Sequence, residues 1–164
     1  MAKHVWTVLC RQAIVDEFTK NASLVETIDE IAFAPAGELP DAWSNLPLEA
    51  VFVSFVTRSD PNVPERSRLK VELFAPNGEA NQQVHTVEVD LTNHKRARTV
   101  FQFKALPVRE FGIHTFVFSL EASDSSNKWA KVAEIPLEYK RQEVPVAELP
   151  ATQVTVKKRA KKRT

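Results

Sequence analysis

The chain has 164 residues, of which 43% are hydrophobic and 26% charged, and its formal net charge at pH 7 is +1. This length suits one ordinary domain, and no apolar run approaches the roughly 20 residues that a membrane-spanning helix needs. Because the N-terminal residues also lack the apolar stretch and small-residue cleavage site of a signal peptide, the sequence predicts a cytoplasmic protein.

Strand-like patterns and proline-rich connections make up the N-terminal part of the chain. The first strand-like run covers about residues 4 to 15, and a second covers 24 to 32, where apolar and polar residues alternate with one change of phase. Residues 34 to 47 contain three prolines and a glycine. They predict a long connection, in which residues 39 to 46 can form one helical turn.

The most apolar segment of the chain spans residues 50 to 56, with Ser54 as its single polar residue. A continuous apolar run of this length is typical of a central strand that is covered on both faces. We therefore expect the ring of Phe55 to lie in the buried core.

Strands continue through the second half of the chain, with turn residues between them. In Ala75-Pro76-Asn77-Gly78, proline has the fixed φ that a turn needs and glycine tolerates a positive φ, so this segment predicts a hairpin tip. The expected strands cover about residues 69–74, 84–91, 100–106, 113–120 and 128–139.

The spacing of these elements indicates the fold class. About eight strands recur roughly every ten residues, and no long amphipathic helix separates them. The prediction is an all-β, two-sheet antiparallel sandwich, immunoglobulin-like or C2-like, over residues 1 to 139. Residues 140 to 164 are expected to form an extended linker and a basic tail.

Three groups of motifs carry a family resemblance: Ala13-Ile14-Val15-Asp16, the segment from Val71 to Gly78, and Leu106-Pro107 followed by Phe111 to Phe118. With these motifs the chain resembles, over about residues 8 to 139, a family of small bacterial β-sandwich proteins of unknown function. The resemblance implies the fold and a bacterial or phage source. It supplies no catalytic motif.

The candidates for nucleophilic catalysis are Cys10 and the four histidines. Cys10 is the only cysteine, which excludes an intramolecular disulfide, and it lies in an apolar strand pattern where a thiol usually serves as a small hydrophobic residue. The histidines are scattered and do not have the spacing of a zinc site. We expect no enzyme, no cofactor and no metal site.

Acidic residues give no stronger indication of a site. A calcium-binding sandwich needs several aspartates crowded into the loops at one end. Here Asp41, Asp60 and Asp124 stand singly in separate loops. The adjacent acids Asp16-Glu17 and Asp29-Glu30 point to opposite faces of a strand, so neither pair can act as one catalytic unit.

Aromatic residues suggest a partner site at one position. Phe101, Phe103, Phe116 and Phe118 have the period-two spacing of a base-stacking platform, but a core face explains that spacing better. Trp43 lies in a polar, proline-framed loop, where an aromatic ring suits a protein interface or caps the open end of a sandwich.

The charge distribution divides the chain into two parts. Residues 140 to 164 contain eight basic and two acidic residues, whereas residues 1 to 139 contain 14 basic and 19 acidic residues. A solvated run of cations can bind phosphates without reading bases. The candidate nucleic-acid contacts are Lys157, Lys158, Arg159, Lys161, Lys162 and Arg163.

Two functions follow from these observations. The first is a non-catalytic binding or assembly module that contacts an unidentified protein partner through sheet edges and end loops. The second is a nucleic-acid-associated protein whose basic tail contacts phosphates.

Overall fold

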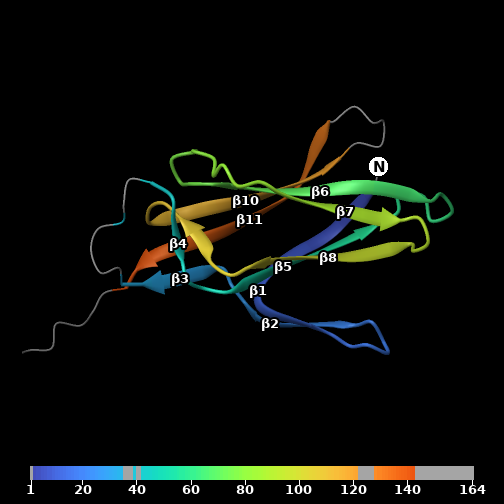
Figure 1. Cartoon of the computed structure of the whole chain (residues 1–164), viewed down its shortest axis with the longest axis horizontal. Helices are drawn as coiled ribbons and strands as arrows, with labels where there is room; N and C mark the ends of the chain where they lie inside the picture. The colour runs from blue at the N-terminus through green and yellow to red at the C-terminus, as the bar shows by residue number, and fades with distance from the viewer. Residues whose placement is uncertain (1, 35–38, 40–41, 122–127, 143–164) are drawn as a thin grey trace, which may run out of the picture.

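The structure, a computed structural model, describes residues 2–34, 39, 42–121 and 128–142. All of the helix or strand structure within these ranges is β-strand, which confirms the all-β prediction. Eleven strands, rather than about eight, are present in these residues (Figure 1): β1 (Lys3–Val15), β2 (Ala22–Thr27), β3 (Glu30–Phe33), β4 (Ser44–Leu46), β5 (Ala50–Thr57), β6 (Glu65–Phe74), β7 (His85–Leu91), β8 (Arg96–Phe103), β9 (Leu106–Val108), β10 (Gly112–Glu121) and β11 (Trp129–Arg141).

The described strands form three sheets. One has the order β2-β1-β5-β8, a second has the order β3-β11-β10-β6-β7, and β4 pairs with β9 in a third. The two larger sheets lie one over the other in Figure 1, with the small sheet at one end. All pairings are antiparallel except that of β3 with β11, which is parallel, so the expectation of antiparallel pairing throughout is wrong for this edge.

The core lies between the facing sides of the two larger sheets. Phe52 on β5 contacts Phe116 and Phe118 on β10, with ring centroids 4.6 and 5.3 Å apart. Alternate residues of a strand face opposite sides, and the buried positions of β6 and β10 follow this period of two.

The second strand-like run, residues 24 to 32, forms two strands in different sheets. Glu26 has a φ of 53°, and β2 ends one residue later, at Thr27. β2 pairs with β1, whereas β3 joins the opposite sheet beside β11. The change of phase in the sequence pattern marks this crossing.

The proline-rich connection contains a short strand where a helical turn was expected. Ser44, Asn45 and Leu46 form β4 and pair with Val108, Pro107 and Leu106 of β9. Pairing with a distant segment therefore overrides the local tendency of these residues to form a turn.

β5 is the central strand predicted from its apolar run, with β1 and β8 on either side. Its inner face carries Phe52, which is fully buried. Phe55 points to the outer face instead and is only half-buried, so the prediction that its ring lies in the core is wrong. Successive side chains of a strand point to opposite faces, so Phe52 and Phe55, three residues apart, lie on opposite faces.

The turn at residues 75 to 78 is confirmed. The backbone N–H of Gly78 donates to the carbonyl of Ala75 at 2.9 Å, and Gly78 has a φ of 84°. Beyond the turn, residues 79 to 84 form an additional polar connection before β7 begins.

The last strand extends past the expected domain boundary at residue 139. β11 ends at Arg141, which pairs with Phe33, and the Gln142 N–H donates to the Phe33 carbonyl at 2.9 Å. Within the described ranges, no helix is long and apolar enough to cross a membrane.

Candidate functional site

Trp43 lies directly before β4, and the pairing of β4 with β9 fixes its position. The Ser44 hydroxyl donates to the Val108 carbonyl at 3.1 Å, which adds to this pairing. The half-buried indole packs against the core and meets the ring of His114 edge to face, with centroids 5.7 Å apart. Part of Trp43 therefore caps the end of the core.

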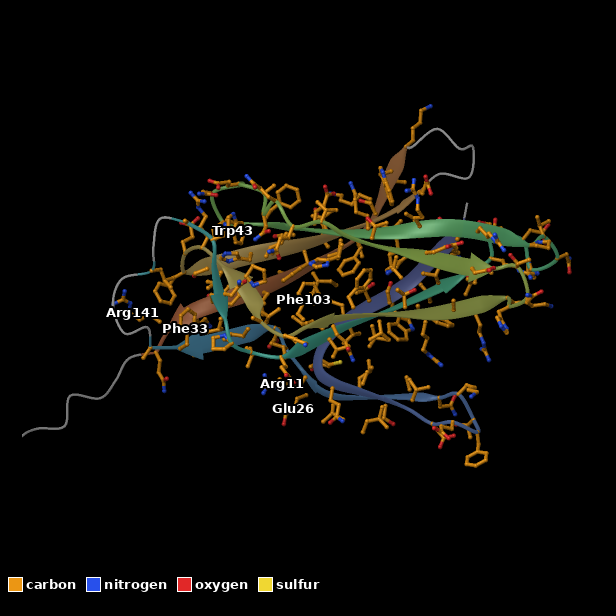
Figure 2. All side chains as sticks on the ribbon, in the orientation of Figure 1. Arg11, Glu26, Phe33, Trp43, Phe103 and Arg141 are labelled. Atoms are coloured by element: carbon orange, nitrogen blue, oxygen red, sulfur yellow. The ribbon has the colours of Figure 1, made fainter. Side chains whose placement is uncertain are left out.

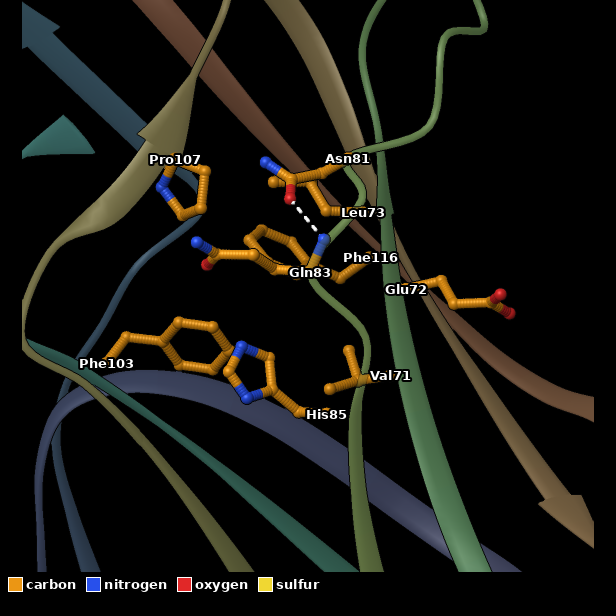
Figure 3. Close-up of a pocket in the computed structure, with 9 residues that line it drawn as sticks. All are labelled: Val71, Glu72, Leu73, Asn81, Gln83, His85, Phe103, Pro107 and Phe116. Carbon is orange, nitrogen blue, oxygen red and sulfur yellow. Dashed lines mark hydrogen bonds between the residues drawn. The ribbon is translucent and has the colours of Figure 1, made fainter. Parts of the chain in front are cut away.

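The remaining surface of Trp43 lines a cleft of about 270 Å³, together with Asn45 and residues 79 to 83. An adjoining crevice shares Asn81 and Gln83 with this cleft and continues to His85 and Phe103 (Figure 3). The crevice itself has a volume of about 10 Å³, which is room for a single water molecule. We call the combined surface the Trp43 groove, lined by Trp43, Asn45, Asn81, Gln83, His85 and Phe103.

Hydrogen bonds hold the 79–83 connection in place. Asn81 Oδ1 accepts from the Gln83 N–H at 2.7 Å (Figure 3), and the Asn81 N–H donates to the Leu73 carbonyl at 2.8 Å. Glu79 at the start of the segment forms an ion pair with Arg109. These contacts give the wall of the groove a defined shape.

Three amide side chains in the cleft offer hydrogen-bonding groups to a ligand. Asn45, Gln82 and Gln83 line the cleft, and their side-chain amides form no hydrogen bond with another residue in the described part of the chain. Each amide offers both a donor and an acceptor. The cleft therefore combines the apolar Trp43 ring with uncharged hydrogen-bonding groups, and its carboxylate, Glu79, is paired with Arg109.

His114 lies behind Trp43 in an aromatic stack. Its ring is buried and meets Tyr139 edge to face at 4.7 Å, and its Nε2 accepts from the Arg109 N–H at 3.3 Å. Burial lowers the pKa of His114, and this outweighs the opposing effects of the Gly112 backbone and Glu110. The neutral ring then carries its proton on Nδ1.

Two buried donors in this stack have no hydrogen-bond partner among the described residues: His114 Nδ1 and Trp43 Nε1. Orphaned donors of this kind are costly, and an acceptor reaching them would be favoured. Sequence reasoning missed this pair, because nothing in the local pattern places His114 beside Trp43.

Cys10 has the surroundings of a structural thiol. It is fully buried, and its Sγ donates to the Val51 carbonyl at 3.5 Å. Burial raises the pKa of the Cys10 thiol more than the nearby backbone N–H groups of Gln12 and Val25 lower it. A reactive cysteine needs the opposite shift.

Titratable side chains form no metal-binding cluster within the described ranges. Of the loop aspartates, Asp60 binds the Asn62 N–H at 2.9 Å, whereas Asp41 and Asp124 lie outside those ranges. Asp16 accepts from two backbone N–H groups and the Thr19 hydroxyl in its own turn, and these bonds lower its pKa.

The four phenylalanines at period-two spacing belong to the core. Phe101, Phe116 and Phe118 are buried, and Phe103 is half-buried at the rim. They are therefore not a base-stacking platform, in agreement with the preferred interpretation of the sequence.

The basic tail proposed as a nucleic-acid contact lies outside the described residues. The polar connection at 79 to 83 was the signal that sequence reasoning overlooked. It contains Asn81, Gln82 and Gln83, separated by two residues from the predicted hairpin tip, and three consecutive amide side chains offer several hydrogen-bond donors and acceptors.

No protein-family model and no curated protein matches the sequence. Similar solved structures include a β-glucuronidase from Bacteroides uniformis (11% identity, TM-score 0.45, 58% of this chain and 12% of that chain covered). A second is the C-terminal domain of wzt (11%, 0.46, 87% and 75%). A third is an immunoglobulin-like protein from Pseudomonas aeruginosa (9%, 0.37, 85% and 97%). The chain thus spans only a small part of the first of these.

Proposed function

We propose that the protein is a non-catalytic β-sandwich module of the cytoplasm that binds a protein partner in the Trp43 groove. The groove itself carries this proposal: aromatic rings at its two ends flank amide side chains that form no hydrogen bond with another described residue. Aromatic residues are enriched at protein interfaces because they bury much surface with little loss of conformational freedom.

The chemistry of the groove favours an uncharged peptide segment as the ligand. Amide groups match the donors and acceptors of a peptide backbone, whereas the one carboxylate in the cleft, Glu79, is already paired with Arg109. The burial of Cys10 and His114 supports a binding role rather than catalysis, because a nucleophile or base must reach its substrate.

Affinity capture with matched variants tests the proposal. Asn45→Lys and Gln83→Lys place charged groups in the groove without removing a core contact, and Thr86→Lys, on β7 outside the groove, is the control. A protein retained by the wild-type chain and the control, but lost from both groove variants, is the expected result. A photo-reactive residue at position 83 should cross-link to the same protein.

Equal capture by the groove variants and the control would contradict the proposal. Enrichment of a protein that cross-links only at other positions would contradict it as well. Thermal melting of each variant shows whether any loss of capture comes from unfolding.

The charge distribution supports a second candidate function, in which the basic tail contacts nucleic acid. The run from 157 to 163 has six cations, and the body up to residue 139 has an excess of five acids. Duplex binding through the tail should then show a slope of log K against log salt no steeper than about −5. Replacing Lys161, Lys162 and Arg163 with alanine should halve that slope, whereas an unchanged slope would exclude the tail.

A further inference from the structure

The outer face of the β2-β1-β5-β8 sheet carries aromatic and basic side chains that lie apart from the Trp43 groove. Residues that pair directly across antiparallel strands share a face. Trp6, Phe55 and Arg98 form one such row, because Phe55 pairs with Trp6 on β1 and with Arg98 on β8. Arg96 lies two residues from Arg98 and therefore on the same face, about 7 Å along the strand.

The β1–β2 hairpin folds back over part of this face (Figure 1). Its tip is tied to β8, since Arg98 Nη1 donates to the Lys20 carbonyl. Val53 lies on the same outer face as Phe55 but is only 1% exposed, which indicates that the hairpin packs closely over it. To one side of Val53 the hairpin and the sheet enclose a cleft of about 300 Å³.

This cleft is lined by cations. Lys20 comes from the hairpin, and Arg96 and Arg98 come from β8. None of the three forms an ion pair with a carboxylate among the described residues, in contrast to Arg66 and Arg109, which do. Three unneutralised cations therefore meet in one cleft of a body whose overall charge is negative.

The acids near the cleft do not neutralise these cations. Asp16 is occupied by its own turn, where it binds the Thr19 N–H at 2.6 Å. Asp90 accepts a hydrogen bond from the Thr92 N–H at 2.7 Å and lies 3.5 Å from Arg66, and the Thr92 hydrogen bonds, followed by the charge of Arg66, lower its pKa. An anion entering the cleft thus meets guanidinium and ammonium groups without a competing carboxylate partner.

An aromatic ring accompanies the cations. Phe55 lines the cleft, the Arg98 guanidinium lies 5.6 Å from its centroid, and the Trp6 ring stacks on its other side at 5.6 Å. Cations that track phosphates beside a ring that contacts bases are the combination used by proteins that bind single strands.

We propose that this basic cleft, lined by Lys20, Phe55, Arg96 and Arg98, binds the phosphates of a single-stranded nucleic acid. A single strand is favoured over a duplex because the hairpin covers one side of the cleft, and a duplex is too wide to fit between the hairpin and the sheet. The site is independent of the Trp43 groove, which lies at the other end of the molecule (Figures 1 and 2).

The test measures binding of the full-length protein to an oligothymidylate of about 12 nucleotides as salt is varied. The variants are Arg96→Gln and the double variant Arg96→Gln/Arg98→Gln. The control is Lys104→Gln/Lys128→Gln, which removes two exposed cations that do not line the cleft. All variants keep residues 143 to 164, so any contribution of the tail is constant.

The double variant should weaken binding about tenfold at roughly 50 mM salt and flatten the slope of log K against log salt by about 1.4, since each phosphate contact contributes about 0.7 for a single strand. Arg96→Gln should give half of that change in slope. It also removes no hydrogen bond that holds the hairpin, so it separates lost binding from a loosened fold. Ultraviolet cross-links are expected on β5 and β8.

Several results would overturn the proposal. They are equal losses in the double variant and the control, absence of binding at low salt, cross-links confined to residues 143–164, or equal dependence of duplex binding on Arg96 and Arg98. If Arg96→Gln/Arg98→Gln lost binding to anionic lipid vesicles but bound the oligonucleotide as the wild-type chain does, the cleft would be assigned to a membrane surface instead. The fully exposed Phe18 at the hairpin tip would then be the inserting group.

Discussion

Truncation of Phe52 should destabilise the protein far more than truncation of Phe55, three residues away on the same strand. Phe52 is fully buried and its ring contacts Phe103, Phe116 and Phe118. Replacing a buried phenylalanine with alanine costs about 3–5 kcal/mol, and aromatic pairs add about 0.5–1.5 kcal/mol beyond the area they bury. We expect Phe52→Ala to lie near the upper end, about 4–5 kcal/mol.

Phe55→Ala should cost only about 1–2 kcal/mol, because the half-buried ring loses less apolar contact on truncation. Its losses are the stack on Trp6 and the contact with Arg98. Since a domain of this kind has about 5–15 kcal/mol of stability in total, Phe52→Ala removes a large share of it and Phe55→Ala a small one.

Urea unfolding followed by circular dichroism measures both costs from the midpoints, provided that the dependence on urea is the same in each variant. If Phe55→Ala cost as much as Phe52→Ala, the ring of Phe55 would have to be as fully buried as that of Phe52. The placement of Phe55 in an open basic cleft would then be wrong.

Three further predictions concern pH, backbone and chain length. Because burial lowers the pKa of His114 below its usual 6.5, the free energy of unfolding should be greatest above that pH and fall as the pH drops below it. In His114→Phe, the urea midpoint should therefore change less between about pH 7 and about pH 5.5. The remaining change should come from His4, whose pKa is also lowered by burial. Gly112→Ala should cost about 1–3 kcal/mol and more than Gly78→Ala in the same unfolding assay, since both glycines have positive φ but a Cβ at 112 would meet the Pro76 ring at 3.1 Å. Removing residues 143–164 should leave the thermal transition unchanged, whereas removal from residue 140 onward should lower it, because Lys140 and Arg141 pair with β3.

The sequence was sufficient to predict those parts of the fold that local patterns determine. The apolar run at 50 to 56 gave the central strand, and proline and glycine gave the turn at 75 to 78. Both signals lie within one element and need no knowledge of what packs against it.

Non-local pairing accounts for most of what the sequence could not predict. The parallel edge of β3 and β11 joins residues about 110 positions apart in the chain, and nothing in either segment specifies that partner. The face of Phe55 could not be assigned, because an almost wholly apolar strand has no polar alternation to show which side is inward.

The candidate sites divide in the same way. Trp43 was proposed as a partner site from its polar, proline-framed surroundings, but the other residues of the groove come from β4, the β6–β7 connection, β7 and β8. The sequence around Arg96 and Arg98 does not indicate a binding site, because many other charged residues lie nearby in the chain. Only the pairing with Phe55 and the fold-back of the hairpin bring them together with Lys20.

The separation of the two sites makes them testable one at a time. Effects of substitutions that are far apart and share no partner add, whereas effects within one network do not. The groove has uncharged amides beside aromatic rings, and the cleft has cations beside Phe55, so they should respond to different ligands and differently to salt. A chain carrying both Gln83→Lys and Arg96→Gln should therefore lose protein capture and oligonucleotide binding by the same factors as the single variants. If instead Gln83→Lys altered oligonucleotide binding, the ligand would have to reach from one end of the sheets to the other, and the assignment of two independent sites would fail.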